Sequence, residues 1–374
     1  MEFIDLKAQY RALQPAIDAG IRHVLEGAHF IGGSEVKELE TRLAAYVGRK
    51  HCISCANGTE ALQLVFMAYG IEAGDAVFCP DMTFISSVEP AAMLGATPVF
   101  CDIDPQTYNL DPLSLEKQIE RVEREGKYRP RFVVAVDFLG NPADFEAISA
   151  ICRTHGLILI EDAAQGTGAS RNSRKCGSFG DIATTSFFPS KPLGCYGDGG
   201  AVFTDDDEIA DVLNSLKVHG KGPKGKYDNV RIGLNSRLDT LQAAVLLAKL
   251  DILEQEIVTR QAVAKRYDEA FRGRIQIPAV TPGSVSAYAQ YCVLAESPEQ
   301  RQRILDAMKA AEVPSLIYYP NVLHALDAFA PYEGDITLPN AKHYAECNFG
   351  MPFSPYLTDE DQQKVIDTVL GALA

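Results

Sequence analysis

The feature that most limits the fold is a regular alternation of short apolar runs and longer amphipathic segments through the first half of the chain. We expect strands at residues 51–56, 76–79, 98–102, 132–136 and 157–160. Helices are expected between them, at residues 59–69, before residue 95, and at residues 113–124 and 142–155. Continuously apolar strands separated by helices of this length form parallel sheets covered on both faces, so the sequence predicts an α/β fold.

The chain on either side of this region has a different pattern. Residues 5–48 are expected to be helical, with an interruption at residues 30–34. The second half predicts a long helix at 241–270, strands at 288–295 and 315–319, and helices at 298–311 and 359–373. We therefore expect a large α/β domain over residues 1–240, with a mostly parallel sheet flanked by helices. A smaller C-terminal α+β domain over residues 241–374 is joined to it through the long helix.

Charge and cysteine usage limit the partners and the compartment. The formal charge of −15 argues against nucleic acid or an anionic membrane as the main partner. Nine irregularly spaced cysteines, with no apolar leader ahead of them, indicate reduced thiols in a soluble cytoplasmic protein. The C-x-x-C of Cys52 and Cys55 has no second pair of ligands, so no metal site is expected.

Lys191 is the first candidate for chemistry. It lies between an apolar run at residues 184–188 and a second short strand at residues 201–204. Its neighbours are residues that favour turns: Pro189, Ser190, Pro192 and Gly194. An amine held by turns at the edge of a core loses solvation, which lowers its pKa and lets it form a Schiff base with a carbonyl. A solvated surface charge is the simpler alternative.

Three further groups follow strands, at the sheet edge where ligands of open α/β folds bind. Gly58 and Thr59 begin a helix after the first strand, and a helix N-terminus favours phosphate. Asp162 ends a buried strand, and the adjacent Glu161 faces the opposite way. Phe84 brings an aromatic ring to the same edge. Two of them have an ordinary structural alternative, a capped turn for the glycine and a core position for the ring. Together with a lysine they match pyridoxal phosphate.

Several motifs occur in order along essentially the whole chain: F-I-D-L-K-A-Q, N-G-T-E-A-L, E-D-A-A-Q, S-F-F-P-S-K, G-L-N-S-R-L-D and L-I-Y-Y-P. With them the sequence resembles the DegT/StrS-type nucleotide-sugar aminotransferases, which are fold type I pyridoxal-phosphate enzymes with an aspartate-aminotransferase-like fold. The resemblance is greatest to the UDP-linked 3-keto sugar aminotransferases of surface polysaccharide synthesis, including O-antigen and lipopolysaccharide.

The resemblance implies roles for individual residues. Lys191 would bind pyridoxal 5'-phosphate as a Schiff base and then move protons, while pyridoxamine phosphate is the intermediate form of the cofactor. Asp162 would pair with the pyridine nitrogen, Gln165 would lie near the ring hydroxyl, and Phe84 would stack on the ring. The phosphate would be held by Gly58, Thr59, Ser186 and, from the neighbouring chain, Asn235. A homodimer with shared active sites is implied.

Residues that would contact the substrate are proposed from a basic segment and from positions after it. Residues 219–231 form the only strongly basic segment, which suits an anionic nucleotide diphosphate, although a solvated loop is the alternative. The substrate-binding candidates are Lys221, Arg231, Arg237, Tyr318 and His324. Two features depart from the family pattern. Pro192 stands where Asn is common, and P-N-V-L-H-A replaces a P-x-P-L-H-x-Q type stretch.

The predicted function is therefore an aminotransferase that moves an amino group from an amino acid, taken to be L-glutamate, to a keto group of a nucleotide-linked sugar. The expected acceptor is the 3-keto position of a UDP- or dTDP-sugar. The alternatives are amination at C-4, dehydration by the same scaffold, and a non-catalytic sugar-nucleotide sensor. Some family members carry His in place of the lysine and dehydrate their substrates, so Lys191 favours transamination.

Overall fold

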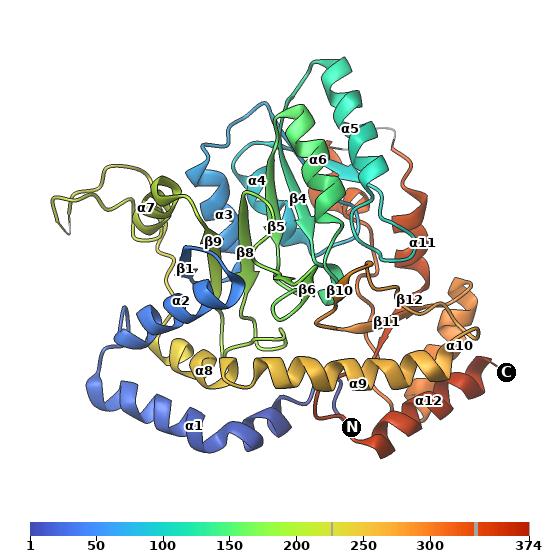
Figure 1. Ribbon diagram of the computed structural model, residues 1–374. Coiled ribbons are helices and arrows are strands. Elements are labelled where there is room, and N and C mark those ends of the chain that lie inside the picture. Colours follow the sequence, from blue (N-terminus) through green and yellow to red (C-terminus); the bar gives the residue numbers. More distant parts are fainter. Residues whose placement is uncertain (226, 333–335, 374) are drawn as a thin grey trace.

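The computed structural model describes residues 1–225, 227–332 and 336–373. Its centre is a seven-stranded sheet with the order β1-β9-β8-β5-β4-β2-β3 (Figure 1). The strands are β1 His51–Cys55, β2 Asp75–Pro80, β3 Thr97–Cys101, β4 Arg129–Val136, β5 Ile158–Asp162, β8 Ile182–Ser186 and β9 Gly200–Thr204. Only β9 is antiparallel to its neighbours in this sheet, so the other strands all end at the same edge.

Helices cover both faces of this sheet. Leu39, Ile119, Ile148 and Leu246 belong to one apolar core. Leu62, Ala91 and Leu213 belong to the other. The helices that supply these residues are α2 Ser34–Val47, α5 Pro112–Glu125, α6 Phe145–His155 and α8 Thr240–Leu250 for the first face, and α3 Gly58–Ala68, α4 Glu89–Met93 and α7 Asp207–Leu216 for the second. Successive residues of β4 enter alternate cores, as strand geometry requires. The predicted α/β fold class is confirmed.

The N-terminal and C-terminal segments complete the molecule. α1 Leu6–Gly27 packs along α8, and α9 Leu253–Phe271 continues from α8 toward the C-terminal helices (Figure 1). A third apolar core joins α9 to α10 Pro298–Ala310 and α12 Asp359–Leu373. The remaining elements are β6 Ser170–Arg171, β7 Arg174–Lys175, β10 Ser284–Val285, β11 Tyr291–Leu294, β12 Asn348–Met351, α11 Pro339–Cys347 and the short 3-10 helices η1 Ile85–Ser87, η2 Phe138–Gly140, η3 Leu323–Ala325 and η4 Asp327–Tyr332. The domain boundary near residue 240 stays a prediction.

Several elements differ from the sequence prediction. The long helix at 241–270 is two helices, because the N–H of Ile252 bonds to the carbonyl of Lys249, three residues back. No strand forms at 315–319, where Leu316 makes a single bridge to Gly350. The partner of β11 is instead β12, which the sequence did not reveal. The short helix α7 was also missed, and β8 ends at Ser186 before the two phenylalanines.

Two general expectations concern the membrane and the thiols. Within the described ranges, no helix is both long and apolar enough to cross a bilayer. All nine cysteines are buried free thiols.

Candidate active site

Lys191 lies in the loop between β8 and β9. The N–H of Lys191 bonds to the carbonyl of Phe188 at 2.9 Å, which closes a tight turn directly before the lysine. The side chain is half-buried. Burial lowers the pKa of its amine, and the negative charge of Asp162 opposes part of that shift. The turn predicted from the prolines and glycine therefore exists, and it holds an amine near a carboxylate.

Asp162 is the last residue of β5 and is almost fully buried. Its Oδ2 accepts a hydrogen bond from the hydroxyl of Ser87 at 2.8 Å, and its Oδ1 accepts one from the N–H of Ala164 at 3.1 Å. Burial raises the pKa of this carboxyl, while the two hydrogen bonds and the charge of Lys191 act in the opposite direction. A buried carboxylate of this kind is stabilised further by a cationic ligand.

The adjacent Glu161 faces the other side of the sheet. Its two carboxylate oxygens accept the N–H groups of Gly177 and Phe179, both at 2.6 Å. Only one of the two neighbouring carboxylates is thus directed to the side of Ser87, as the alternation of strand side chains predicts.

The N-terminus of α3 packs against the end of β8. Asn57 caps the helix by accepting the N–H of Glu60 at 2.8 Å, so the N–H groups of Gly58 and Thr59 have no carbonyl within the helix to bond. A methyl group at Gly58 would lie 2.8 Å from Cβ of Ser186. The hydroxyl of Thr59 lies 2.8 Å from the hydroxyl of Ser86. The structure therefore brings together backbone donors and hydroxyls in a cradle that suits a phosphate.

Aromatic rings gather at the ends of β2 and β5. The ring of Phe84 is 51% exposed, and its centroid is 5.9 Å from that of Tyr319. Gln165 accepts the N–H of Leu139 at 2.7 Å through its Oε1. Burial raises the pKa of Tyr319, and Asp162 adds to that shift, whereas a hydrogen bond with Gln165 opposes it. These couplings place Tyr319 with Phe84, Gln165 and Asp162.

Sequence reasoning missed two of these residues. Ser87, which donates to Asp162, is also 2.9 Å from the hydroxyl of Thr83 four residues earlier. That spacing of two hydroxyls was a visible signal in the sequence. Tyr319 follows Tyr318 directly, and only the first of the two tyrosines was named as a candidate. The Tyr318 ring instead stacks on Phe3, with centroids 6.1 Å apart.

The proposed substrate residues are more dispersed. His324 is held by the fully buried Asp81, whose carboxylate accepts the His324 N–H at 2.9 Å and lies 2.6 Å from Nδ1. The segment between α7 and α8 projects from the body of the molecule (Figure 1). The candidates Lys221, Arg231, Asn235 and Arg237 are among its exposed residues. Lys226 of the basic segment lies outside the described residues. The binding roles of all these positions stay predictions.

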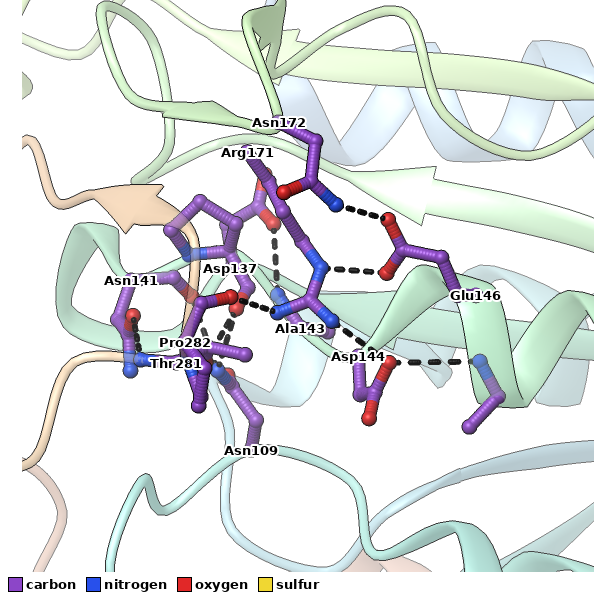
Figure 2. A network of polar contacts seen from close by, with 12 residues as sticks. Asn109, Asp137, Asn141, Ala143, Asp144, Glu146, Arg171, Asn172, Thr281 and Pro282 are labelled. Carbon is purple, nitrogen blue, oxygen red and sulfur yellow. Dashed lines mark hydrogen bonds and ion pairs between the residues drawn. The ribbon is translucent and has the colours of Figure 1, made fainter.

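A polar network fixes the turn that follows β4, next to Gln165. Figure 2 shows the guanidinium of Arg171 between α6 and the segment before β10. Arg171 donates to Glu146, to Asp144 at 2.9 Å and to the carbonyl of Pro282 at 3.0 Å. Thr281 donates its hydroxyl to the carbonyl of Pro142 at 2.7 Å. A segment of the C-terminal half is thereby attached to the loop that supplies the Leu139 N–H.

The residues at this edge fit pyridoxal phosphate. That cofactor requires an amine for its aldehyde, a carboxylate for its pyridine nitrogen, a phosphate cradle and contacts to its ring. The structure provides Lys191, Asp162 and the Gly58 cradle from three different elements at one edge of the sheet. The glycine is required there because a Cβ would collide with Ser186.

Comparisons with known proteins agree on one family. The model of the DegT/DnrJ/EryC1/StrS aminotransferase family matches residues 12–370. A UDP-2-acetamido-2-deoxy-3-oxo-D-glucuronate aminotransferase from Pseudomonas aeruginosa is 46% identical over 371 residues, covering 99% of each chain. Two crystal structures are similar throughout. One, of a DegT DnrJ EryC1 StrS aminotransferase from Brucella abortus, has 45% identity, 99% coverage of each chain and a TM-score of 0.96. The other, of S. venezuelae DesV in complex with a ketimine intermediate, has 35% identity, covers 100% of this chain and 98% of that one, and has a TM-score of 0.93.

Proposed function

Because the chain belongs to the DegT/DnrJ/EryC1/StrS aminotransferase family, we propose that it aminates the 3-keto position of a UDP-linked N-acetylated sugar acid. The protein is a pyridoxal-phosphate-dependent nucleotide-sugar aminotransferase. The observation that carries the choice of acceptor is the 46% identity, over 99% of both chains, to an enzyme named for a UDP-linked 3-oxo sugar acid.

Four finer features belong to the same proposal. L-glutamate supplies the amino group, and two copies of the chain share their active sites. The exposed positions of Asn235 and Arg237 support the second feature, because an exposed asparagine and arginine are available to a neighbouring copy. The reaction takes place in the cytoplasm, where nine free thiols remain reduced, and it serves surface polysaccharide synthesis.

The residues of the chain divide the work of the reaction. Pyridoxal phosphate, when bound, withdraws electrons from the substrate carbon next to the transferred nitrogen. Lys191 is then the base, because burial lowers the pKa of its amine and leaves Nζ able to accept a proton from that carbon and return it elsewhere. Asp162 holds a proton on the pyridine nitrogen through its negative charge. Ser87 and Ala164 favour the charged form of Asp162.

The remaining residues of the site bind and orient. The first turn of α3 would direct its free N–H groups toward the phosphate of a bound cofactor and so anchor it. Phe84 offers a partly exposed ring face for stacking. Gln165, fixed by the N–H of Leu139, presents its amide nitrogen to a hydroxyl acceptor.

The test follows nitrogen from donor to sugar. The purified protein is incubated with pyridoxal phosphate, ¹⁵N-labelled L-glutamate and UDP-2-acetamido-2-deoxy-3-oxo-D-glucuronate. We expect ¹⁵N in the sugar at C-3, by mass spectrometry and NMR. The Lys191→Ala variant should lose turnover but still bind the cofactor.

Other results identify the alternatives. A product with ¹⁵N at C-4 would reject the proposed amination at C-3. A product that has lost water and carries no ¹⁵N would indicate a dehydratase. Failure of glutamate to change the absorption of the bound cofactor would exclude glutamate as donor. Substantial turnover by the Lys191→Ala variant would remove the proposed base.

A further inference from the structure

The loop that carries Lys191 is closed on itself at its base. The N–H of Phe187 bonds to the carbonyl of Gly199 at 2.7 Å, and the N–H of Cys195 bonds to the carbonyl of Phe187 at 2.8 Å. Gly194 packs directly against the residues before the lysine, since a methyl group there would lie 2.7 Å from the carbonyl oxygen of Phe188. The position of Gly194 therefore sets the position of the Lys191 turn.

Lys249 makes a hydrogen bond to the backbone of Gly194. This lysine of α8 is 2% exposed, and its Nζ donates to the carbonyl of Gly194 at 2.6 Å. The ammonium also lies 4.4 Å from the centroid of the Tyr196 ring, within the range of a cation–π contact. Burying an unpaired cation costs free energy. We therefore infer that the bond from Lys249 to the loop carbonyl has a function in that loop.

A second residue of α8 binds the same loop. Gln242 lies seven residues before Lys249, which is two turns of helix and therefore the same face. Its Oε1 accepts the N–H of Tyr196 at 2.8 Å, and its Nε2 donates to the carbonyl of Tyr196 at 3.3 Å. One face of α8 thus fixes the backbone of the loop at Gly194 and again at Tyr196.

The ammonium of Lys249 also responds to the charge of a carboxylate on the next helix, α9. Burial lowers the pKa of Lys249 to about 8, and the carboxylate of Glu256 opposes that shift. Glu256 is itself held by the amide of Gln9 at 2.9 Å and the hydroxyl of Tyr356 at 2.7 Å. Glu256, Gln9 of α1 and Tyr356 therefore form a hydrogen-bonded group whose charge favours the ammonium form of Lys249.

We propose that Lys249 and Gln242 are positioning residues for Lys191. This proposal rests on the proposed function only for the catalytic role of Lys191. Neither residue touches the reacting atoms. Each fixes the loop backbone on the side of Lys191 that leads into β9. When both are in place, the turn of residues 188–191 cannot rotate independently of α8, and the amine of Lys191 is presented in one orientation.

The test removes the hydrogen bonds from α8 to the loop and keeps the size of the side chains. Lys249→Met and Gln242→Leu delete the donors and acceptors with little change in volume. Lys175→Met is the matched control, because Lys175 also donates to a glycine carbonyl, that of Gly168 at 3.2 Å, and lies 5.1 Å from a tyrosine ring centroid. Amide hydrogen exchange of the full-length protein is measured by mass spectrometry, with and without added pyridoxal phosphate.

We expect exchange in peptides covering residues 187–199 to rise about tenfold to a hundredfold in Lys249→Met without cofactor, the loss expected of a hydrogen bond to a charged group. The rise should be smaller in Gln242→Leu and absent in Lys175→Met. Once an acceptor sugar is turned over, kcat should fall at least about tenfold in Lys249→Met while KM for the sugar stays within about twofold, because the loop presents the base and does not bind sugar.

Two results would overturn the proposal: unchanged loop exchange in both α8 variants, or an equal rise in Lys175→Met. If Lys249→Met loosens the whole sheet, Gln242→Leu decides, since an increase confined to the loop supports the proposal and no increase rejects it. The exchange measurement needs no sugar substrate. A protein that fails to aminate the sugar but shows the loop effect would therefore reject the proposed substrate and leave the positioning intact.

Discussion

The buried pair of Asp137 and Glu161 gives the sharpest test of how the sheet edge is built. Oxygen atoms of both carboxyl groups and the Sγ of Cys176 lie within 4.8 Å of one another, all buried. Glu161 accepts two backbone N–H groups at 2.6 Å, which favour its charged form. Among the described residues, Asp137 accepts one backbone N–H, that of Ala143 at 3.4 Å, and its Oδ2 accepts no backbone N–H. We therefore expect one proton on this pair, and we place it on Asp137.

The energetic consequence follows from proton linkage. Burial and the charge of Glu161 raise the pKa of Asp137 well above its ordinary value of 3.8. A raised folded-state pKa contributes stability that is complete below the unfolded value and is lost as the pH rises toward the folded value. Burial raises the pKa of Glu161 to about 7, so above that pH any proton that the folded pair still holds is on Asp137. The free energy of unfolding should then fall by about 1.4 kcal/mol per pH unit because of this residue.

The Asp137→Asn variant carries an amide in place of the protonated acid and takes up no proton on folding. Relative to the wild type, its free energy of unfolding should increase by about 1.4 kcal/mol for each pH unit over which Asp137 is protonated only in the folded chain. For 374 residues this corresponds to a relative rise in Tm of about 2 °C per pH unit. The measurement is thermal unfolding of both proteins at several pH values in saturating pyridoxal phosphate. Titrating groups that the substitution does not affect then cancel in the difference between the two proteins.

Glu161→Gln supplies the opposite case. Its amide nitrogen would face the N–H of Gly177 or Phe179, leaving a buried donor unpaired at a cost of about 1–3 kcal/mol at every pH. Parallel pH profiles for Asp137→Asn and the wild type would refute the assignment of a proton to Asp137. If Glu161→Gln flattens the profile instead, the proton belongs to Glu161.

Three other perturbations probe the site and its support. Ser87→Ala removes a hydrogen bond that favours charged Asp162, so the pKa of Asp162 should rise. In a pH–rate profile, kcat should fall about tenfold near pH 6 and less near pH 8. An acid limb of the profile that does not shift would contradict this. Gly58→Ala places a methyl 2.8 Å from Cβ of Ser186, and we expect affinity for pyridoxal phosphate to drop about tenfold or more in a fluorescence titration, whereas equal affinity would mean that the cradle is elsewhere. Arg171→Met breaks the network of Figure 2 and should cost about 1–3 kcal/mol of stability in urea unfolding, with kcat of the folded enzyme unchanged; a loss of kcat alone would contradict a structural role.

Much of the fold could be predicted from the sequence because its signals are local. Runs of apolar residues define the strands of the main sheet, and helical periodicity defines most helices between them. The failures are also local in origin. β12 is a short run that follows α11 directly, and pattern alone does not separate it from the end of that helix. The break between α8 and α9 has no proline or glycine to announce it, since Asp251 and Ile252 stand there.

The sequence by itself indicated the candidate residues for chemistry, because a lysine in a proline-bounded turn, a carboxylate at a strand end and a glycine at a helix start are set by neighbours in the chain. Only the tertiary structure decided what surrounds them. Ser87 reaches Asp162 across 75 residues and Lys249 reaches Gly194 across 55. Such meetings depend on the order of strands in the sheet and on how α8 packs beneath it, and no local pattern encodes either. The physical reason is that backbone propensity acts over a few residues, whereas hydrogen bonds between buried side chains form only after burial has brought distant segments together.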